Sequence, residues 1–260
     1  MRTIGVDLAA EAVRTAVAIV DWRPGGAVVR NLRLGADDDA VCAAVEDAHL
    51  AGIDCPFGWP DGFVALVEAH HAGRLAAPSS SDRAWRRPLT MRATDLWVHE
   101  HTGLVPLSVA ADRIAHAALR LTAVLARLTG RGINCARDGS GRVAEVYPAA
   151  ALKSWGLPFR GYKGPAGQGV REVMVARLAE HAPWLELGGA RELCVRSDDA
   201  LDALVCALVA RAVAQGASAR PVDRVQARRE GWIHVPTGPL ARLVPGATSR
   251  RPPLADPPPV

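Results

Sequence analysis

The chain has 260 residues, of which 49% are hydrophobic, so it carries enough apolar side chains for a substantial core and is expected to be globular. Its 31 basic residues nearly balance 27 acidic ones, and the net charge of +4 permits a nucleic-acid partner without requiring one. Because no apolar run is long enough to cross a membrane and the five cysteines are widely spaced, we expect a soluble cytoplasmic protein with reduced cysteines and no membrane partner.

Three β-prone runs occupy the start of the chain, at residues 3–9, 13–22 and 27–34, and the turn sequence PGG separates the last two. They predict an antiparallel meander. A helix is expected over residues 37–48, where three aspartates stand at its positive end, and a short buried strand follows within AGIDCP. The predicted order is therefore three strands, a helix and a fourth strand.

The middle of the chain is less regular. Asp61 is expected to cap a helix formed by DGFVALVEAHHAG. Residues 77–106 carry Pro, Ser, Arg and Trp with little periodicity, and we predict that they form an insertion or a flap over the site. A long helix over residues 108–129 and a strand within RVAEVYP follow.

The last part of the chain contains the strongest helix. The loop GYKGPAGQG precedes a helix at residues 169–182, and SDDALDALVCALVARAV forms the next one, with Ser197 as its N-cap. GWIHVP is expected to be a short strand. We predict one domain over residues 1–245 and a disordered Pro- and Arg-rich tail over residues 246–260.

Several acidic residues stand where a structural role is hard to assign. Asp7, Asp54 and Glu145 interrupt or close predicted buried strands, and burying an unpaired charge costs several kcal/mol. Asp202 lies about 100° round its helix from Leu201, at the edge of the apolar stripe. If these elements lie side by side, the acids converge on an oxygen-ligand site suited to Mg²⁺ or Mn²⁺.

Each of these acids also has a structural explanation. Asp7 can cap a turn at the end of its strand, and Asp54 can form an Asx turn before a proline. Alternation along RVAEVYP can place Glu145 on an exposed face, and Asp199 suits the positive end of a helix dipole. The metal-site hypothesis depends on the acids occurring together.

The order of the elements resembles the ribonuclease H fold, with an aspartate in the first strand, an acid in the fourth and DALDAL in a late helix, a motif similar to that of Holliday-junction resolvases. The segments GVDLA, IDCPFGWP, RATD, EVYPAA and SDDALDALVCA, together with Lys163 and Arg171, resemble a family of predicted nucleases called domain of unknown function 429. This resemblance runs over roughly residues 3–235.

The resemblance implies an α/β fold of ribonuclease H-like type: a mixed sheet of three antiparallel strands followed by parallel strands, flanked by helices, with a mid-chain insertion. It also implies a metal-dependent nuclease whose ligands are Asp7, Asp54 and Asp202, with Asp199 as a further ligand candidate and Glu145 as a further catalytic candidate. Function belongs to the site and not to the fold, so the activity is an expectation.

For this site we expect two Mg²⁺ or Mn²⁺ ions and hydrolysis of a phosphodiester bond in nucleic acid. Arg92, Lys163 and Arg171 are predicted to contact substrate phosphates, although Arg92 and Asp95 can also simply pair with each other. The basic residues of this part of the chain can equally form an ordinary solvated surface.

Two other functions remain open. The first is a non-catalytic nucleic-acid-binding or scaffold protein of ribonuclease H fold, whose acids are structural. The second is a phosphotransferase of the actin and sugar-kinase type, which is disfavoured because Leu8, Ala9 and Ala10 follow Asp7 where phosphate binding needs glycines. No GxSxG or HExxH motif is present, so serine-hydrolase and zinc-protease chemistry are not expected.

Overall fold

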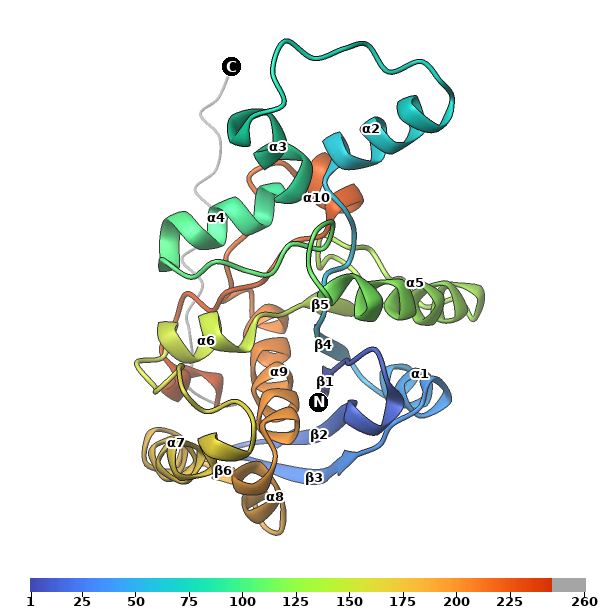
Figure 1. The fold of residues 1–260 in the computed structure, drawn as a ribbon. Helices are drawn as coiled ribbons and strands as arrows, with labels where there is room; N and C mark the ends of the chain where they lie inside the picture. Colours follow the sequence, from blue (N-terminus) through green and yellow to red (C-terminus); the bar gives the residue numbers. More distant parts are fainter. Residues whose placement is uncertain (245–260) are drawn as a thin grey trace, which may run out of the picture.

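The computed structural model of the chain describes residues 1–244, so the tail predicted at residues 246–260 lies outside the described residues. Its centre is a mixed sheet of six strands in the order β5-β4-β1-β2-β3-β6 (Figure 1). An antiparallel meander is formed by β1 (Arg2–Asp7), β2 (Ala16–Arg23) and β3 (Gly26–Leu34). The parallel strands are β4 (Leu50–Asp54) and β5 (Val143–Glu145) beyond β1, and β6 (Leu185–Glu186) beside β3. The predicted α/β class and the meander are confirmed.

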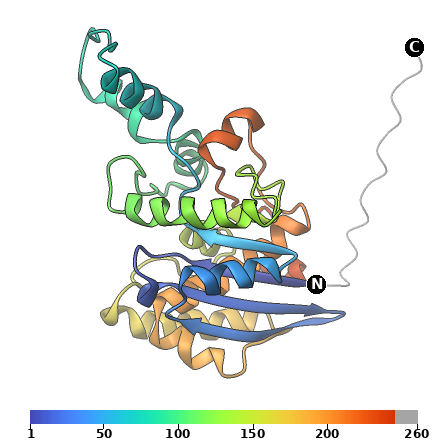
Figure 2. The same cartoon turned by 90° about the vertical axis from the view of Figure 1, so that its right-hand side faces the viewer.

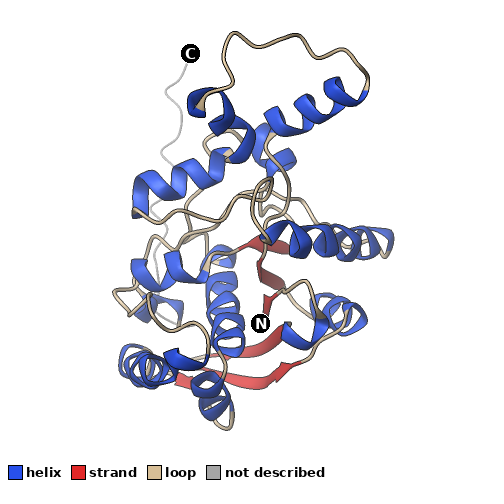
Figure 3. Cartoon of the chain, in the orientation of Figure 1, coloured by secondary structure: helices blue, strands red, loops and turns tan. Residues whose placement is uncertain are grey.

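Helices account for much of the remaining chain (Figure 3). In order they are α1 (Asp38–Glu46), α2 (Asp61–His71), α3 (Arg83–Thr90), α4 (Ala93–Thr102), α5 (Ile114–Gly130), α6 (Pro148–Ser154), α7 (Gln168–His181), α8 (Ala190–Arg196), α9 (Asp198–Ala214) and α10 (Arg224–Glu230). No helix in this described part combines the length and the apolar character that a membrane crossing requires. All five cysteines are free, and only Cys135 is not fully buried.

The strand sequences place one apolar set on each face of the sheet. Ile4 and Val6 of β1 pack with α1 and α5, whereas Ala16, Ala18 and Val20 of β2 face the cluster around α9. Figure 1 shows α9 on one side of β1 and β4, with α1 and α5 on the other. The sheet is therefore covered on both faces, as expected for a sheet that contains parallel strands.

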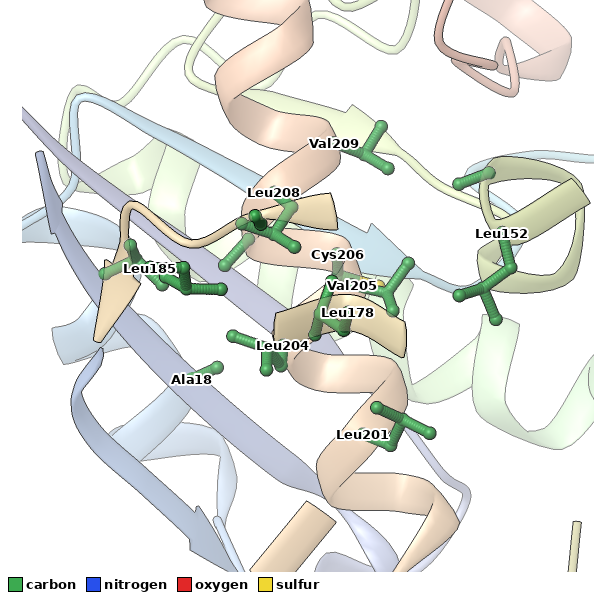
Figure 4. Close-up of a cluster of buried hydrophobic side chains, with 14 of the residues drawn as sticks. Ala18, Leu152, Leu178, Leu185, Leu201, Leu204, Val205, Cys206, Leu208 and Val209 are labelled. Atoms are coloured by element: carbon green, nitrogen blue, oxygen red, sulfur yellow. The ribbon is translucent and has the colours of Figure 1, made fainter. Parts of the chain in front are cut away.

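The helix α9 is more deeply buried than its sequence indicates. We predicted an apolar stripe on one face, with Asp202 at its edge, yet every residue from 200 to 210 is buried. The reason is that α9 packs on the sheet with one side and is covered on the other by α6, α7 and α8. Figure 4 shows Leu152 of α6 and Leu178 of α7 near this helix. Its small alanines and its cysteine let neighbours approach from all directions.

The segment at residues 77–106 differs from the prediction, because it contains the helices α3 and α4. Its many arginines hid the helical periodicity. Together with α2, α3 projects from the body of the molecule, away from the sheet (Figure 2). Asp61 does not cap α2, because Pro60 is the N-cap residue and the Asp61 carboxylate pairs instead with Arg229 at 2.7 Å.

Two further predictions need correction at the C-terminal side. GWIHVP forms no strand and contributes only isolated bridges, between Ile233 and Glu145 and between Pro236 and Ser218. The neighbouring β5 is only three residues long, so it offers too short an edge for a full strand. The expected helix N-cap at Ser197 is confirmed, since its side chain accepts from the amide of Ala200 at 3.2 Å.

Candidate functional site

The packing of α9 on the sheet sets the position of the acidic residues. A Cβ atom on Gly5 would lie 1.8 Å from the carbonyl oxygen of Ala203, and one on Gly52 would lie 2.4 Å from that of Cys206. Both strands therefore need glycine where the helix backbone crosses them. Two residues further along each strand, on the same face, stand Asp7 and Asp54. The close packing of α9 on β1 and β4 therefore lies directly beside the two acidic residues.

Asp7 and Asp54 lie directly opposite each other in the register of β1 and β4. Both are half-buried, and both line a cleft of about 740 Å³ at the ends of these strands. Within residues 1–244, neither carboxylate accepts a hydrogen bond or forms an ion pair. Two adjacent carboxylates without partners are the feature of the site that most needs a cation.

Asp202 enters the site from α9 but occupies a different environment. It is completely buried and does not line the cleft. One carboxylate oxygen accepts a hydrogen bond from the Tyr162 hydroxyl at 2.9 Å, and the other pairs with the Lys163 ammonium group. The Lys163 side chain is 55% exposed and lines the cleft. Asp202 therefore holds Lys163 in place, which the sequence did not predict.

The pKa values show how strongly these charges interact. Burial raises the pKa of Asp7 well above its ordinary value, and the charges of Asp54 and Asp202 raise it further. Burial also raises the pKa of Asp54 to about 7, with Lys163 opposing the rise. The same two influences act on Asp202, whose pKa is raised. Burial disfavours the charge of Lys163, but the surrounding carboxylates outweigh it and raise its pKa.

Glu145 faces the same cleft as part of a separate ion-pair network. It is buried with Arg92, whose guanidinium donates to it at 2.7 and 2.9 Å and to Asp95 at 2.7 and 3.1 Å. The amide of Phe57 also donates to Glu145 at 3.0 Å. The expected Arg92–Asp95 pair is thus present, and Glu145 is buried where an exposed position was the alternative. This network fixes α4 against the end of β5.

Asp199 and Arg171 also take up positions that differ from their predicted roles. Both oxygens of Asp199 accept from Arg14, at 2.8 and 2.9 Å, on the rim of the cleft. Arg171 is buried and donates to four backbone carbonyls, including that of Tyr162. Its predicted contact with substrate phosphate does not fit this geometry. Arg171 instead holds the loop that carries Lys163.

The donor atoms of the site match a hard cation, but their arrangement matches it only in part. Carboxylate oxygens from Asp7 and Asp54 are what Mg²⁺ or Mn²⁺ prefers. Among residues 1–244, however, no three acidic, histidine or cysteine side chains are arranged to hold a metal ion as they stand. The reason is that Asp202 is occupied by Lys163 and Asp199 by Arg14. Of the predicted ligands, Asp7 and Asp54 are the two whose carboxylates have no partner among the described residues.

Sequence analysis did not identify three residues of the site. Tyr162 and Arg14 were missed because no pattern joins them to acids 40 and 185 residues away. Tyr147 lines the cleft, and its pKa is raised by burial and then by the charge of Asp54. Its place directly after the EV of EVYP was a usable signal, because residues at strand ends line such clefts.

The fold and the site define an α/β protein with a mixed sheet and an acid-lined cleft at the ends of two parallel strands. The family model described as "Protein of unknown function (DUF429)" matches residues 5–227. The chain therefore belongs to the DUF429 family, as its sequence motifs predicted. No curated protein and no solved structure matches the chain.

Proposed function

We propose that this protein is a metal-dependent phosphodiester hydrolase of nuclease type, built on a ribonuclease H-like variant of the α/β fold. The observation that carries the proposal is the pair Asp7 and Asp54, which stand in register, line one cleft and have no partner among residues 1–244. The order of the first four strands and the crossing helix supports the fold assignment. Glycines at the crossing bring α9 close to both strands, which favours a function for this end of the sheet.

In this proposal Asp7 and Asp54 hold a Mg²⁺ or Mn²⁺ ion. Such an ion supplies Lewis acidity and neutralises the charge of a phosphodiester. Lys163 binds a non-bridging phosphate oxygen, because its side chain lines the cleft and its charge acts on both Asp7 and Asp54. Asp202 and Tyr162 orient Lys163, and Asp199 orients Arg14 at the rim. Because Lys163 occupies Asp202, the geometry favours one ion over the two expected from the sequence.

A cleavage assay tests this proposal. Purified protein is incubated with Mn²⁺ and labelled single-stranded, duplex and branched oligonucleotides, and also with a small phosphodiester, bis(p-nitrophenyl) phosphate. We expect Asp7→Asn to lower the rate about 100-fold or more, as removal of a metal ligand does. Glu172→Gln, which removes an exposed acid on α7, is the matched control and is expected to retain full activity. Activity that survives Asp7→Asn, or that needs no divalent ion, would contradict the proposal.

A non-catalytic nucleic-acid-binding or scaffold protein is the second candidate, and the Lys163–Asp202 pair favours it. An internal lysine that already neutralises part of an acidic cluster is a structural solution to buried charge. The two candidates differ in their response to metal. A nuclease is expected to gain thermal stability with Mn²⁺ and to lose that gain in Asp7→Asn, whereas a scaffold is expected to show no Mn²⁺-dependent shift in either protein.

A further inference from the structure

We infer that the cleft takes a short, single-stranded oligonucleotide and not a nucleic-acid duplex, holding one nucleoside against an apolar wall beside the scissile phosphodiester. This inference rests on the proposed function and narrows its substrate class. Three properties of the cleft carry it, namely its charge, its size and the character of its wall. Each of them distinguishes a short strand from a long duplex.

The charge of the cleft disfavours a long polyanion. Its lining contains six acidic side chains and four basic ones, so the cleft carries no excess of positive charge even with one divalent ion bound. Arg14 is paired with Asp199, Arg92 with Glu145 and Lys163 with Asp202. Among the described residues, Arg113 is the one basic side chain of the lining without a carboxylate partner. Proteins that grip a duplex neutralise roughly 6–10 phosphates with a track of basic side chains. This cleft has too few cations for such a track.

The size of the cleft also favours a short strand over a duplex. Its volume of about 740 Å³ lies in the range of sites that enclose a small ligand, which is roughly 300–1,000 Å³. A specific interface with DNA instead buries on the order of 1,000–2,500 Å² of protein surface. The cleft therefore suits one or two nucleotides at the end of a strand or in a dinucleotide.

The wall of the cleft carries apolar side chains next to the acids. Leu107 precedes α5, Ile114 is the first residue of that helix, and Tyr147 is the N-cap residue of α6, just after β5. Leu107 is 59% exposed although it is a large aliphatic residue. An unpaired base can pack on such apolar and aromatic groups, whereas a base inside a duplex is already stacked on its neighbours. A cleft lined by both apolar and acidic side chains matches a nucleoside followed by a phosphodiester.

Binding and cleavage are measured separately to test this inference. Fluorescence anisotropy follows a labelled single-stranded pentamer and a labelled 20-base-pair duplex, with Ca²⁺ as the divalent ion. We expect the pentamer to bind at least about 10-fold more tightly than the duplex. Leu107→Glu is expected to weaken pentamer binding about 10-fold, because it puts a charge where the base packs. Val105→Glu is the matched control, since Val105 is 61% exposed on the same segment but does not line the cleft.

The outcomes separate this inference from the proposed function. Tighter binding of the duplex, no binding of the pentamer, or equal effects of Leu107→Glu and Val105→Glu would overturn the inference. In another outcome, the pentamer binds and only Leu107→Glu weakens its binding, but no phosphodiester is cleaved, including bis(p-nitrophenyl) phosphate. This result would overturn the proposed hydrolase activity and would leave the inference of a cleft that binds single strands. Cleavage of the pentamer and of a dinucleotide, with the duplex at least about 10-fold slower, would support both.

Discussion

In the proposed metal site, Lys163 determines how many carboxylates remain open to a cation. Its ammonium group pairs with the completely buried carboxylate of Asp202, whose other oxygen is bonded to Tyr162. Asp7 and Asp54 are left without partners in the described part of the chain. A buried carboxylate that loses its only cation is strongly destabilising, whereas a half-exposed lysine that loses its acid is not. Removal of Lys163 is therefore expected to cost more stability than removal of the Asp202 carboxylate.

Replacement of Lys163 by methionine is expected to destabilise the protein by about 2–3 kcal/mol in the absence of metal, because Asp202 would remain buried with no cation. We also expect Mn²⁺ to raise the Tm of Lys163→Met more than that of the wild type, since three carboxylates would then be open to it. Differential scanning fluorimetry with and without Mn²⁺ measures both effects. Lys153→Met is the control, because Lys153 is an exposed lysine that contacts a backbone carbonyl and the Phe159 ring but forms no ion pair with a carboxylate among the described residues. An equal Mn²⁺ response in the wild type and Lys163→Met would contradict this view of Lys163.

Asp54 is expected to make the metal-free protein less stable as the pH rises. Its pKa in the folded chain is about 7, well above the ordinary value of 3.8, so the folded state binds a proton more tightly than the unfolded state does. Its unfavourable contribution therefore grows as the pH rises from about 4 to above 7. We expect Asp54→Asn to increase the free energy of unfolding at pH 8 by on the order of 2 kcal/mol, with little effect at pH 4.

The measurement is urea unfolding of wild type and Asp54→Asn at both pH values in the presence of a chelator. Asp54→Asn is also expected to abolish metal-dependent activity, which is the usual relation between stability and activity at a site of clustered charge. A loss of stability in Asp54→Asn at pH 8 would show that the carboxylate is a structural group. Glu172→Gln, with an exposed side chain, is expected to change neither quantity.

At the scale of elements, the contact between α9 and the sheet positions the whole site. Thr3 donates from its hydroxyl to the carbonyl of Ala207 at 2.9 Å, and Gly5 lies against Ala203 one step along the same face. This regular contact explains why Asp7 arrives beside the N-terminal half of the helix. The separation of the acids is thus fixed by backbone packing and not by the acids themselves.

Substitution of Gly5 by alanine is expected to destabilise the protein by about 3 kcal/mol or more, because the added methyl group would overlap the α9 backbone. The midpoint of urea unfolding should fall while its slope stays unchanged. Gly169→Ala is the control, since nothing lies within 4 Å of its Cβ position in α7, and it is expected to be neutral or slightly stabilising. Equal stability of Gly5→Ala and Gly169→Ala would mean that α9 is free to shift on the sheet.

At the scale of the whole molecule, His234 connects the C-terminal part of the described chain to the turn before β5. Its Nδ1 atom lies 3.1 Å from the Ser218 hydroxyl, and its ring packs against Gly139, where a Cβ atom would lie 2.0 Å from Nε2. The imidazole is 5% exposed, and burial lowers its pKa to about 4. The segment is therefore held by a neutral histidine.

This histidine is expected to make the protein sensitive to acid. The unfolded chain protonates His234 near pH 6.5 and the folded chain only near pH 4, so its favourable contribution is complete above 6.5 and is lost as the pH falls to 4. The loss is on the order of 3 kcal/mol. We expect His234→Gln to be less stable than the wild type at pH 7 but to lose less stability between pH 7 and pH 4.5, as measured by urea unfolding. His181→Gln, at an exposed position, is expected to keep the wild-type pH profile.

Local sequence patterns predicted the antiparallel meander and the positions of two acids at the ends of buried strands. Alternating apolar residues identified the meander, and Asp7 and Asp54 were recognisable because a carboxylate at the end of a buried strand is unusual. The environment of Asp202 was not predictable in this way. Its burial depends on helices that cover α9 from the side away from the sheet, and its partners Tyr162 and Lys163 lie in a loop some 40 residues earlier.

The basic residues show the same limit. Arg92, Lys163 and Arg171 each occur in a motif that favours a phosphate contact, yet Arg92 is bonded to two carboxylates and Arg171 to backbone carbonyls. The sequence identifies a charged residue, but it does not show which of several possible partners pairs with that residue in the folded protein. Only Lys163 keeps a position on the cleft without being fully buried.

The central position of α9 also has a consequence for synthesis. One face of the sheet stays uncovered until this helix has left the ribosome, although β1 to β4 are complete much earlier. At 5–20 residues per second, the roughly 150 residues between Asp54 and Asp202 take on the order of 7–30 s to translate. During that interval the nascent chain exposes apolar strands, and we expect chaperones to bind it. The cleft is therefore assembled only late in translation, when Asp202 pairs with Lys163 and brings it to the cleft that Asp7 and Asp54 line.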